Sequence, residues 1–163
     1  MLLAKSLQVL LLATLLSGCG FQLRHADISA LEAISLSGPV SAEIRRALEQ
    51  SLEDYGITIV AAAPGVVDIR FIDSHSSRRP IATSARMDAA QYELRLELDV
   101  SLALEGQPIA SDISLSAERI YSVDSLNLSG SYEEQQILMS EIRDEVAGMI
   151  IRRVEAWLDN RGS

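Results

Sequence analysis

Residues 91–104 alternate strictly between apolar and polar side chains, and this pattern constrains the fold of the 163-residue chain more than any other. A period of two places successive side chains on opposite faces of a strand. The segment therefore predicts a long strand in a sheet with one face on the core and one face in water. The apolar positions are Tyr92, Leu94, Leu96, Leu98, Val100, Leu102 and Leu104.

The segments around this strand predict three further strands. Residues 105–108 read Glu-Gly-Gln-Pro and predict a turn, after which residues 109–121 return with apolar alternation, as in an antiparallel hairpin. Residues 31–36 and 67–71 also alternate, and each predicts a strand. We expect the polar segment 74–90 to be a long exposed crossing between strands.

Two segments carry apolar side chains at helical spacing. Pro39 opens the first helix, Gly56 is its expected C-cap, and residues 57–60 predict only a short extended segment. Ser131 and Glu134 have the spacing of a capping box, which predicts the start of the second helix. The apolar stripes are Ile44, Leu48, Leu52 and Tyr55 in the first helix, and Leu138, Ile142, Val146, Ile150, Val154 and Trp157 in the second.

Together these elements predict one α+β domain with the order β-α-β-β-β-α. Two amphipathic helices packed on one face of a four-stranded, mostly antiparallel sheet would bury both sets of apolar side chains in one core.

The first twenty residues predict a bacterial lipoprotein. A basic residue precedes the apolar run 7–16, which is too short to cross a hydrocarbon core of ~30 Å as a helix and is typical of a secretory signal. The motif Leu-Ser-Gly-Cys at 16–19 matches the lipobox of lipoprotein signals. We expect residues 1–18 to be a signal peptide and 19–163 to be a single mature domain with lipid attached to Cys19.

The surroundings of Cys19 favour the outer membrane. Cys19 is the only cysteine in the chain, so no disulfide can form within it. Gly20 follows it in place of the aspartate that usually retains such lipoproteins in the inner membrane. Several acyl chains on one residue give durable anchoring.

Charge and residue spacing argue against several classes of function. The formal net charge of −9 becomes −10 once Lys5 is removed with the signal peptide, which disfavours nucleic acid as a partner. His25 and His75 are expected in loops, without cysteines or clustered carboxylates at metal-ligand spacing. A Gly-x-Ser-x-Gly motif is absent from the sequence. We expect no enzymatic activity, no metal and no cofactor.

Three arginines, Arg78, Arg79 and Arg86, lie within nine residues of this acidic chain. One interpretation is a solvated loop. The other is an anion site, because guanidinium groups form bidentate hydrogen bonds with phosphate. A phosphorylated lipid is a natural anion for an outer-membrane lipoprotein.

Several short motifs resemble the lipopolysaccharide-assembly lipoproteins of the LptE family. They are Cys-Gly-Phe-Gln-Leu-Arg at 19–24, Gly-Pro-Val-Ser at 38–41, Tyr-Gly at 55–56, Ala-Gln-Tyr-Glu-Leu at 90–94, and Arg119. Together they extend over nearly the whole mature chain. The resemblance implies two helices on a four-stranded sheet, placed as a plug inside the large outer-membrane barrel LptD. It also implies that the protein helps to assemble that barrel and to deliver lipopolysaccharide to the outer leaflet.

The resemblance also implies site residues. Arg86 stands where the family has an arginine associated with lipopolysaccharide binding, and Arg78 and Arg79 would assist it. A second basic residue of the family, just before the last helix, is replaced here by Ser131. Two other classes stay open: an auxiliary lipoprotein of another envelope lipid-transport system, and an outer-membrane enzyme or inhibitor.

Overall fold

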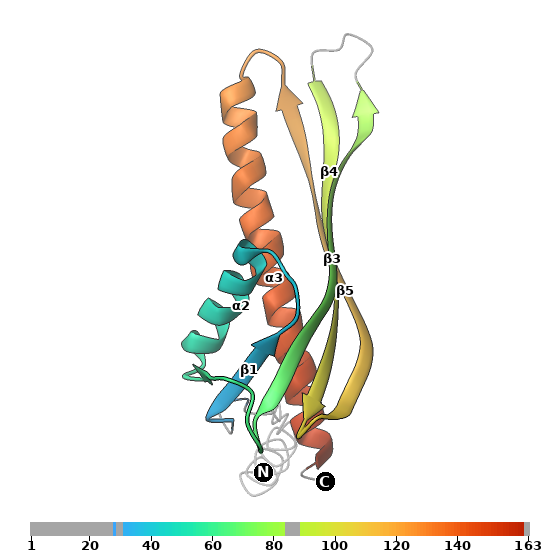
Figure 1. The fold of residues 1–163 in the computed structure, drawn as a ribbon. Helices are drawn as coiled ribbons and strands as arrows, with labels where there is room; N and C mark the ends of the chain where they lie inside the picture. Colours follow the sequence, from blue (N-terminus) through green and yellow to red (C-terminus); the bar gives the residue numbers. More distant parts are fainter. Residues whose placement is uncertain (1–27, 29–30, 84–88, 162–163) are drawn as a thin grey trace, which may run out of the picture.

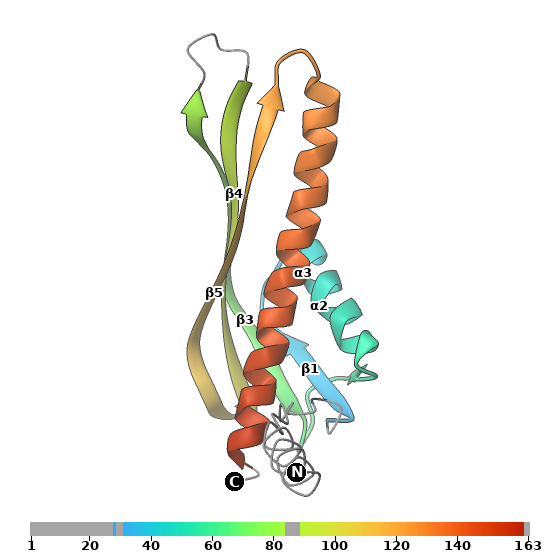
Figure 2. The same cartoon turned by 180° about the vertical axis from the view of Figure 1, so that it is seen from behind.

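A long helix runs beside a twisted sheet for most of the length of the molecule (Figures 1 and 2). The computed structural model describes residue 28 and residues 31–83 and 89–161. The elements in chain order are β1 (Ala33–Ser37), α2 (Ala42–Asp54), β2 (Thr58–Ile59), β3 (Val67–Thr83), β4 (Ala89–Leu104), β5 (Gln107–Asp124) and α3 (Leu128–Arg161). None of the helices in this part of the chain is long and apolar enough to cross a membrane.

The predicted α+β class and the two helices on one face are confirmed, but the sheet is mixed and has five strands. Its order is β2-β1-β3-β4-β5. The short strand β1 runs parallel to both of its neighbours, and β3, β4 and β5 are antiparallel. The fifth strand, β2, was expected only as a short extension. Its two residues pair with Ala33 and Ile34 of β1, a contact that no periodicity over two residues could reveal.

Strand β3 extends to Thr83 and β4 begins at Ala89, so the expected exposed crossing at 74–90 is wrong for residues 74–83 and 89–90. Phe71 pairs with Val100 and Asp73 with Asp99, which leaves Ile72 as an extra residue in a β-bulge. The bulge exchanges the two faces of the strand, so the apolar alternation ends there. Beyond it, backbone pairing with β4 maintains the strand, although its side chains are mostly polar on both faces.

One hydrophobic core lies between the sheet and the two helices. Leu94, Leu96, Leu98, Val100 and Leu102 of β4 are each at most 1% exposed, as their alternation predicts. The helices contribute most of their predicted stripes, and α3 packs on β4 and β5 while α2 packs on α3 and β2. Tyr55 is the exception, because it follows the last residue of α2 and is 48% exposed. The buried helical residues include Ile44, Leu48, Leu52, Ile142, Val146, Ile150 and Val154.

Helix α3 begins three residues before the predicted capping box. Asn127 caps it, because its Oδ1 accepts a hydrogen bond of 3.1 Å from the amide of Gly130. Ser131 lies inside the first turn, where its hydroxyl donates to the carbonyl of Asn127 and accepts from the amide of Asp124. Ser131 therefore ties the end of β5 to α3 instead of starting the helix.

Candidate functional site

The described arginines of the predicted cluster lie near one end of the molecule, called here the distal end, where β3 ends, β4 begins and β5 leads into α3 (top of Figure 1). Arg78 and Arg79 are consecutive residues of β3, so their side chains project to opposite faces of the sheet. One phosphate group therefore cannot be held by both. Arg86 and Cys19 lie outside the described residues.

Arg78 faces the helices and is stacked on two tyrosines. Its Cζ lies 3.5 Å from the ring centroid of Tyr92 and 5.7 Å from that of Tyr121, both within cation–π range. Its Nε donates a 2.7 Å hydrogen bond to the hydroxyl of Tyr121, which in turn donates to Oε1 of Gln135 at 2.8 Å. These contacts connect β3, β4, β5 and α3 at the distal end.

A small pocket of about 220 Å³ opens beside Arg78. Leu128 and Tyr132, whose side chains are well exposed, line it together with Arg78, which gives it a positive charge. Sequence reasoning missed this pocket. The tyrosines belonged to the predicted strand pattern, but the cross-strand register that stacks Arg78 on them is set by the bulge at Ile72.

Arg79 faces the side of the sheet that no helix covers and forms a bidentate ion pair with Glu93. Nε lies 2.7 Å from Oε1 and Nη2 lies 2.9 Å from Oε2. The two side chains differ in accessibility, since that of Arg79 is 65% exposed and that of Glu93 only 9%. The hydrogen bonds from Arg79 hold the pKa of Glu93 below its ordinary value, and Glu93 raises the pKa of Arg79.

Arg119, one of the residues that carry the family resemblance, has a structural role. Its Nη2 lies 2.8 Å from Oε2 of Glu145, and its Nε lies 3.8 Å from Oε2 of Glu141. Both glutamates belong to α3, whereas Arg119 belongs to β5. These ion pairs of Arg119 with Glu141 and Glu145 therefore connect α3 to the edge strand β5.

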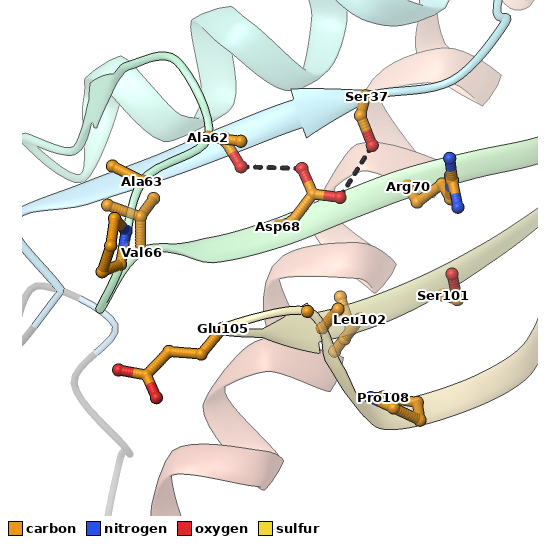
Figure 3. Close-up of a pocket in the computed structure, with 14 residues that line it drawn as sticks. Ser37, Ala62, Ala63, Val66, Asp68, Arg70, Ser101, Leu102, Glu105 and Pro108 are labelled. Carbon is orange, nitrogen blue, oxygen red and sulfur yellow. Dashed lines mark hydrogen bonds between the residues drawn. The ribbon is translucent and has the colours of Figure 1, made fainter.

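A larger groove, of about 920 Å³, lies toward the opposite end on the helix-free face of the sheet (Figure 3). Residues 62–66 and the β4–β5 turn border it, and β1, β3 and β4 form its floor. Asp68 is held there by two hydroxyl groups, because Ser35 and Ser37 each donate to one of its carboxylate oxygens at 2.7 Å.

In the part of the chain that the structure describes, the groove does not contain a serine paired with a histidine. Two of its serine hydroxyls, those of Ser35 and Ser37, donate directly to Asp68, and no histidine is among its described lining residues. His75 lies on β3 opposite Glu97, away from the groove. Within the residues that the structure describes, no three His, Cys, Asp or Glu side chains are grouped so as to hold a metal ion.

Solved structures with the same fold include lipoproteins from three bacteria. Rare lipoprotein B from Shewanella oneidensis is 24% identical, with a TM-score of 0.69 over 80% of this chain and 99% of that one. Lipoprotein B from Nitrosomonas europaea is 21% identical, with a TM-score of 0.69 over 86% and 93%. The minor lipoprotein from Acinetobacter baumannii is 19% identical, with a TM-score of 0.64 over 77% and 91%.

These likenesses show that the chain shares its fold with these lipoproteins. The sequence itself defines the family. The family model LptE, lipopolysaccharide-assembly, matches residues 28–154, and the chain belongs to this family. None of the curated proteins matches the sequence.

Proposed function

We propose that this protein is an outer-membrane lipoprotein that plugs the LptD barrel, helps to assemble it, and takes part in delivering lipopolysaccharide to the outer leaflet. The observation that carries the proposal is the match to the lipopolysaccharide-assembly family over residues 28–154. The role is one of assembly and binding, without catalysis.

The surface of the fold suits a barrel lumen, which is lined with polar groups. The apolar side chains of β4 are buried under the helices, and its outward side chains include Glu93, Arg95, Glu97 and Asp99. Arg95 pairs with Glu97 at 3.0 Å and approaches Glu118 at 3.7 Å, and Glu93 pairs with Arg79, so most of the charges named on this face are paired. Such a face can lie against polar walls while burying little unpaired charge.

We place the lipid anchor at Cys19, at the end opposite the distal end. Ile28 is fully buried, and its carbonyl accepts a hydrogen bond from Leu31, just before β1. Eight residues lie between Cys19 and Ile28, so the tether of nine residue steps reaches at most about 30 Å from the folded domain. The fold is therefore held close to the periplasmic leaflet of the outer membrane.

Enclosure by a barrel can be tested with photo-crosslinkers on opposite faces of the domain. Ser116 is exposed on the outer face of β5, and Gln50 is exposed on α2. We expect both positions to capture the same large outer-membrane barrel in living cells, because a plug is surrounded on all sides. Capture from one position only would contradict the plug arrangement. Adducts with inner-membrane transporter subunits alone would favour an auxiliary lipoprotein of another lipid-transport system.

We also propose that lipopolysaccharide phosphates bind at the distal end through Arg86, with Arg78 and Arg79 contributing from the two faces of β3. Arg86 is three residues from Thr83, so chain length keeps its Cα within about 11 Å of the end of the strand. The acidic charge of the rest of the domain opposes binding weakly, because salt screens exposed charges beyond about 8 Å.

Substitution of Arg86 by aspartate should weaken lipopolysaccharide binding by about tenfold or more, since a charge-assisted hydrogen bond contributes roughly 1.5–3 kcal/mol. The loss should shrink as salt rises. Binding by the purified lipoprotein in detergent, with circular dichroism to confirm folding, provides the measurement. Arg46→Asp makes the same charge change at an exposed position of α2 and should bind like wild type. Equal affinities of wild type and Arg86→Asp at low salt would contradict the assignment.

A further inference from the structure

We propose that Glu93 competes with lipopolysaccharide phosphate for Arg79. The phosphate must displace the Glu93 carboxylate from Arg79 before Arg79 can bind the phosphate. The inference rests on the proposed lipopolysaccharide-binding function of the distal end and adds a residue that sets its affinity. Glu93 would keep binding weak enough for a protein that has to release its lipid.

The geometry of the pair favours such an exchange. A guanidinium group has N–H donors on three nitrogens, and Glu93 occupies only Nε and Nη2 of Arg79. Among the described residues, none accepts a hydrogen bond from Nη1. Because Arg79 is 65% exposed above a carboxylate that is only 9% exposed, an anion from solvent meets the guanidinium group first.

Glu93 also keeps a cationic neighbour when Arg79 turns away. Its pKa is lowered mainly by the hydrogen bonds from Arg79, and to a smaller degree by the charge of Arg95. Arg95 lies two residues along β4, so it projects from the same face of the sheet. The carboxylate would therefore remain near a positive charge while Arg79 binds phosphate.

The only step is an exchange of ion-pair partners, in which the Arg79–carboxylate hydrogen bonds are replaced by Arg79–phosphate hydrogen bonds. Arg79 differs in this respect from Arg78, whose guanidinium group is stacked on Tyr92 and bonded to Tyr121 and has no carboxylate to release. The competitor therefore acts on one arginine of the cluster.

The test is a double-mutant cycle on the full-length lipoprotein in detergent, titrated with lipopolysaccharide. Glu93→Gln should bind roughly tenfold more tightly than wild type, because Arg79 no longer has to leave a carboxylate. Arg79→Gln alone should weaken binding, since it removes the phosphate contact of Arg79, but by less than Arg86→Asp does, because the displacement of Glu93 offsets part of that contact. The double variant should lose the whole gain of Glu93→Gln. Inorganic phosphate should compete away the same gain.

Glu97→Gln is the matched control. It removes the same charge from the same face of β4, but Glu97 pairs with Arg95 at 3.0 Å and not with Arg79. An equal gain in Glu97→Gln would mean that only net charge matters and would overturn the proposal. So would unchanged or absent binding in a folded Glu93→Gln protein. If Glu93→Gln does not fold, Glu93→Asp, whose shorter side chain weakens the bidentate pair, should give a smaller gain, and no gain would overturn the proposal.

The two substitutions distinguish failure of the competitor proposal from failure of the proposed lipopolysaccharide-binding function. Weaker binding by Arg86→Asp together with unchanged affinity of Glu93→Gln would support the binding site and contradict the competing role of Glu93. Tighter binding by Glu93→Gln together with unchanged affinity of Arg86→Asp would support the competing role of Glu93 and show that Arg86 is not part of the site.

Discussion

Alanine in place of Gly38 should lower the free energy of unfolding by about 3 kcal/mol or more. Gly38 has a φ of +84°, which disfavours any residue with a Cβ atom. A Cβ atom built there would lie 2.1 Å from the carbonyl oxygen of Phe71, so the backbone of β3 would have to move. Urea denaturation followed by circular dichroism gives the measurement.

Gly56→Ala is the control for backbone strain alone. Gly56 has a φ of +76°, but a Cβ atom there would meet nothing within 4 Å. Its substitution should cost only the strain of a left-handed residue, about 1–2 kcal/mol. Equal losses at the two positions would show that the contact between Gly38 and β3 contributes nothing.

Replacement of Cys19 by serine should abolish lipid attachment altogether, because in the proposed anchor the Cys19 thiol is the acceptor of the lipid. The unprocessed precursor, with residues 1–18 still attached, should accumulate, and intact-mass spectrometry should find no lipidated form. Ser17→Ala keeps a small residue before the cysteine and should be processed normally. A mature, soluble protein that begins at another residue would contradict the anchor.

Periodicity predicted the elements that are held by side-chain burial. The alternation of β4 and the apolar stripes of α2 and α3 correspond mostly to residues that the core buries, with Tyr55 as an exposed exception. Elements that are held by backbone hydrogen bonds alone show no such periodicity in the sequence. The distal half of β3 is polar and is held by its ladder to β4, and the two residues of β2 are too few to show a period. The cap at Asn127 was not predicted, because Ser131 and Glu134 have the spacing of a capping box and lie within two turns of the actual helix start.

The sequence predicted which arginines belong to the candidate site, but not how their side chains are arranged. The density of arginines in an acidic chain pointed to Arg78 and Arg79, but their opposite orientations follow from membership of a strand rather than a loop. Their partners, Tyr92, Tyr121 and Glu93, come from other strands. Only the register of β3 and β5 on β4 brings them together, and the bulge in β3 shifts that register by one residue.

The single helix α3 fixes the distance between the two ends of the fold. With 34 residues it is about 51 Å long, more than the ~30 Å hydrocarbon core of a bilayer and close to the 40–45 Å that includes the headgroups. β1 and β3 begin, and α3 ends, at the end that would lie near the lipid anchor (Figure 2). In the proposed arrangement the domain is a rigid spacer, which sets the depth at which Arg78 and Arg79 meet the outer leaflet without any change of conformation.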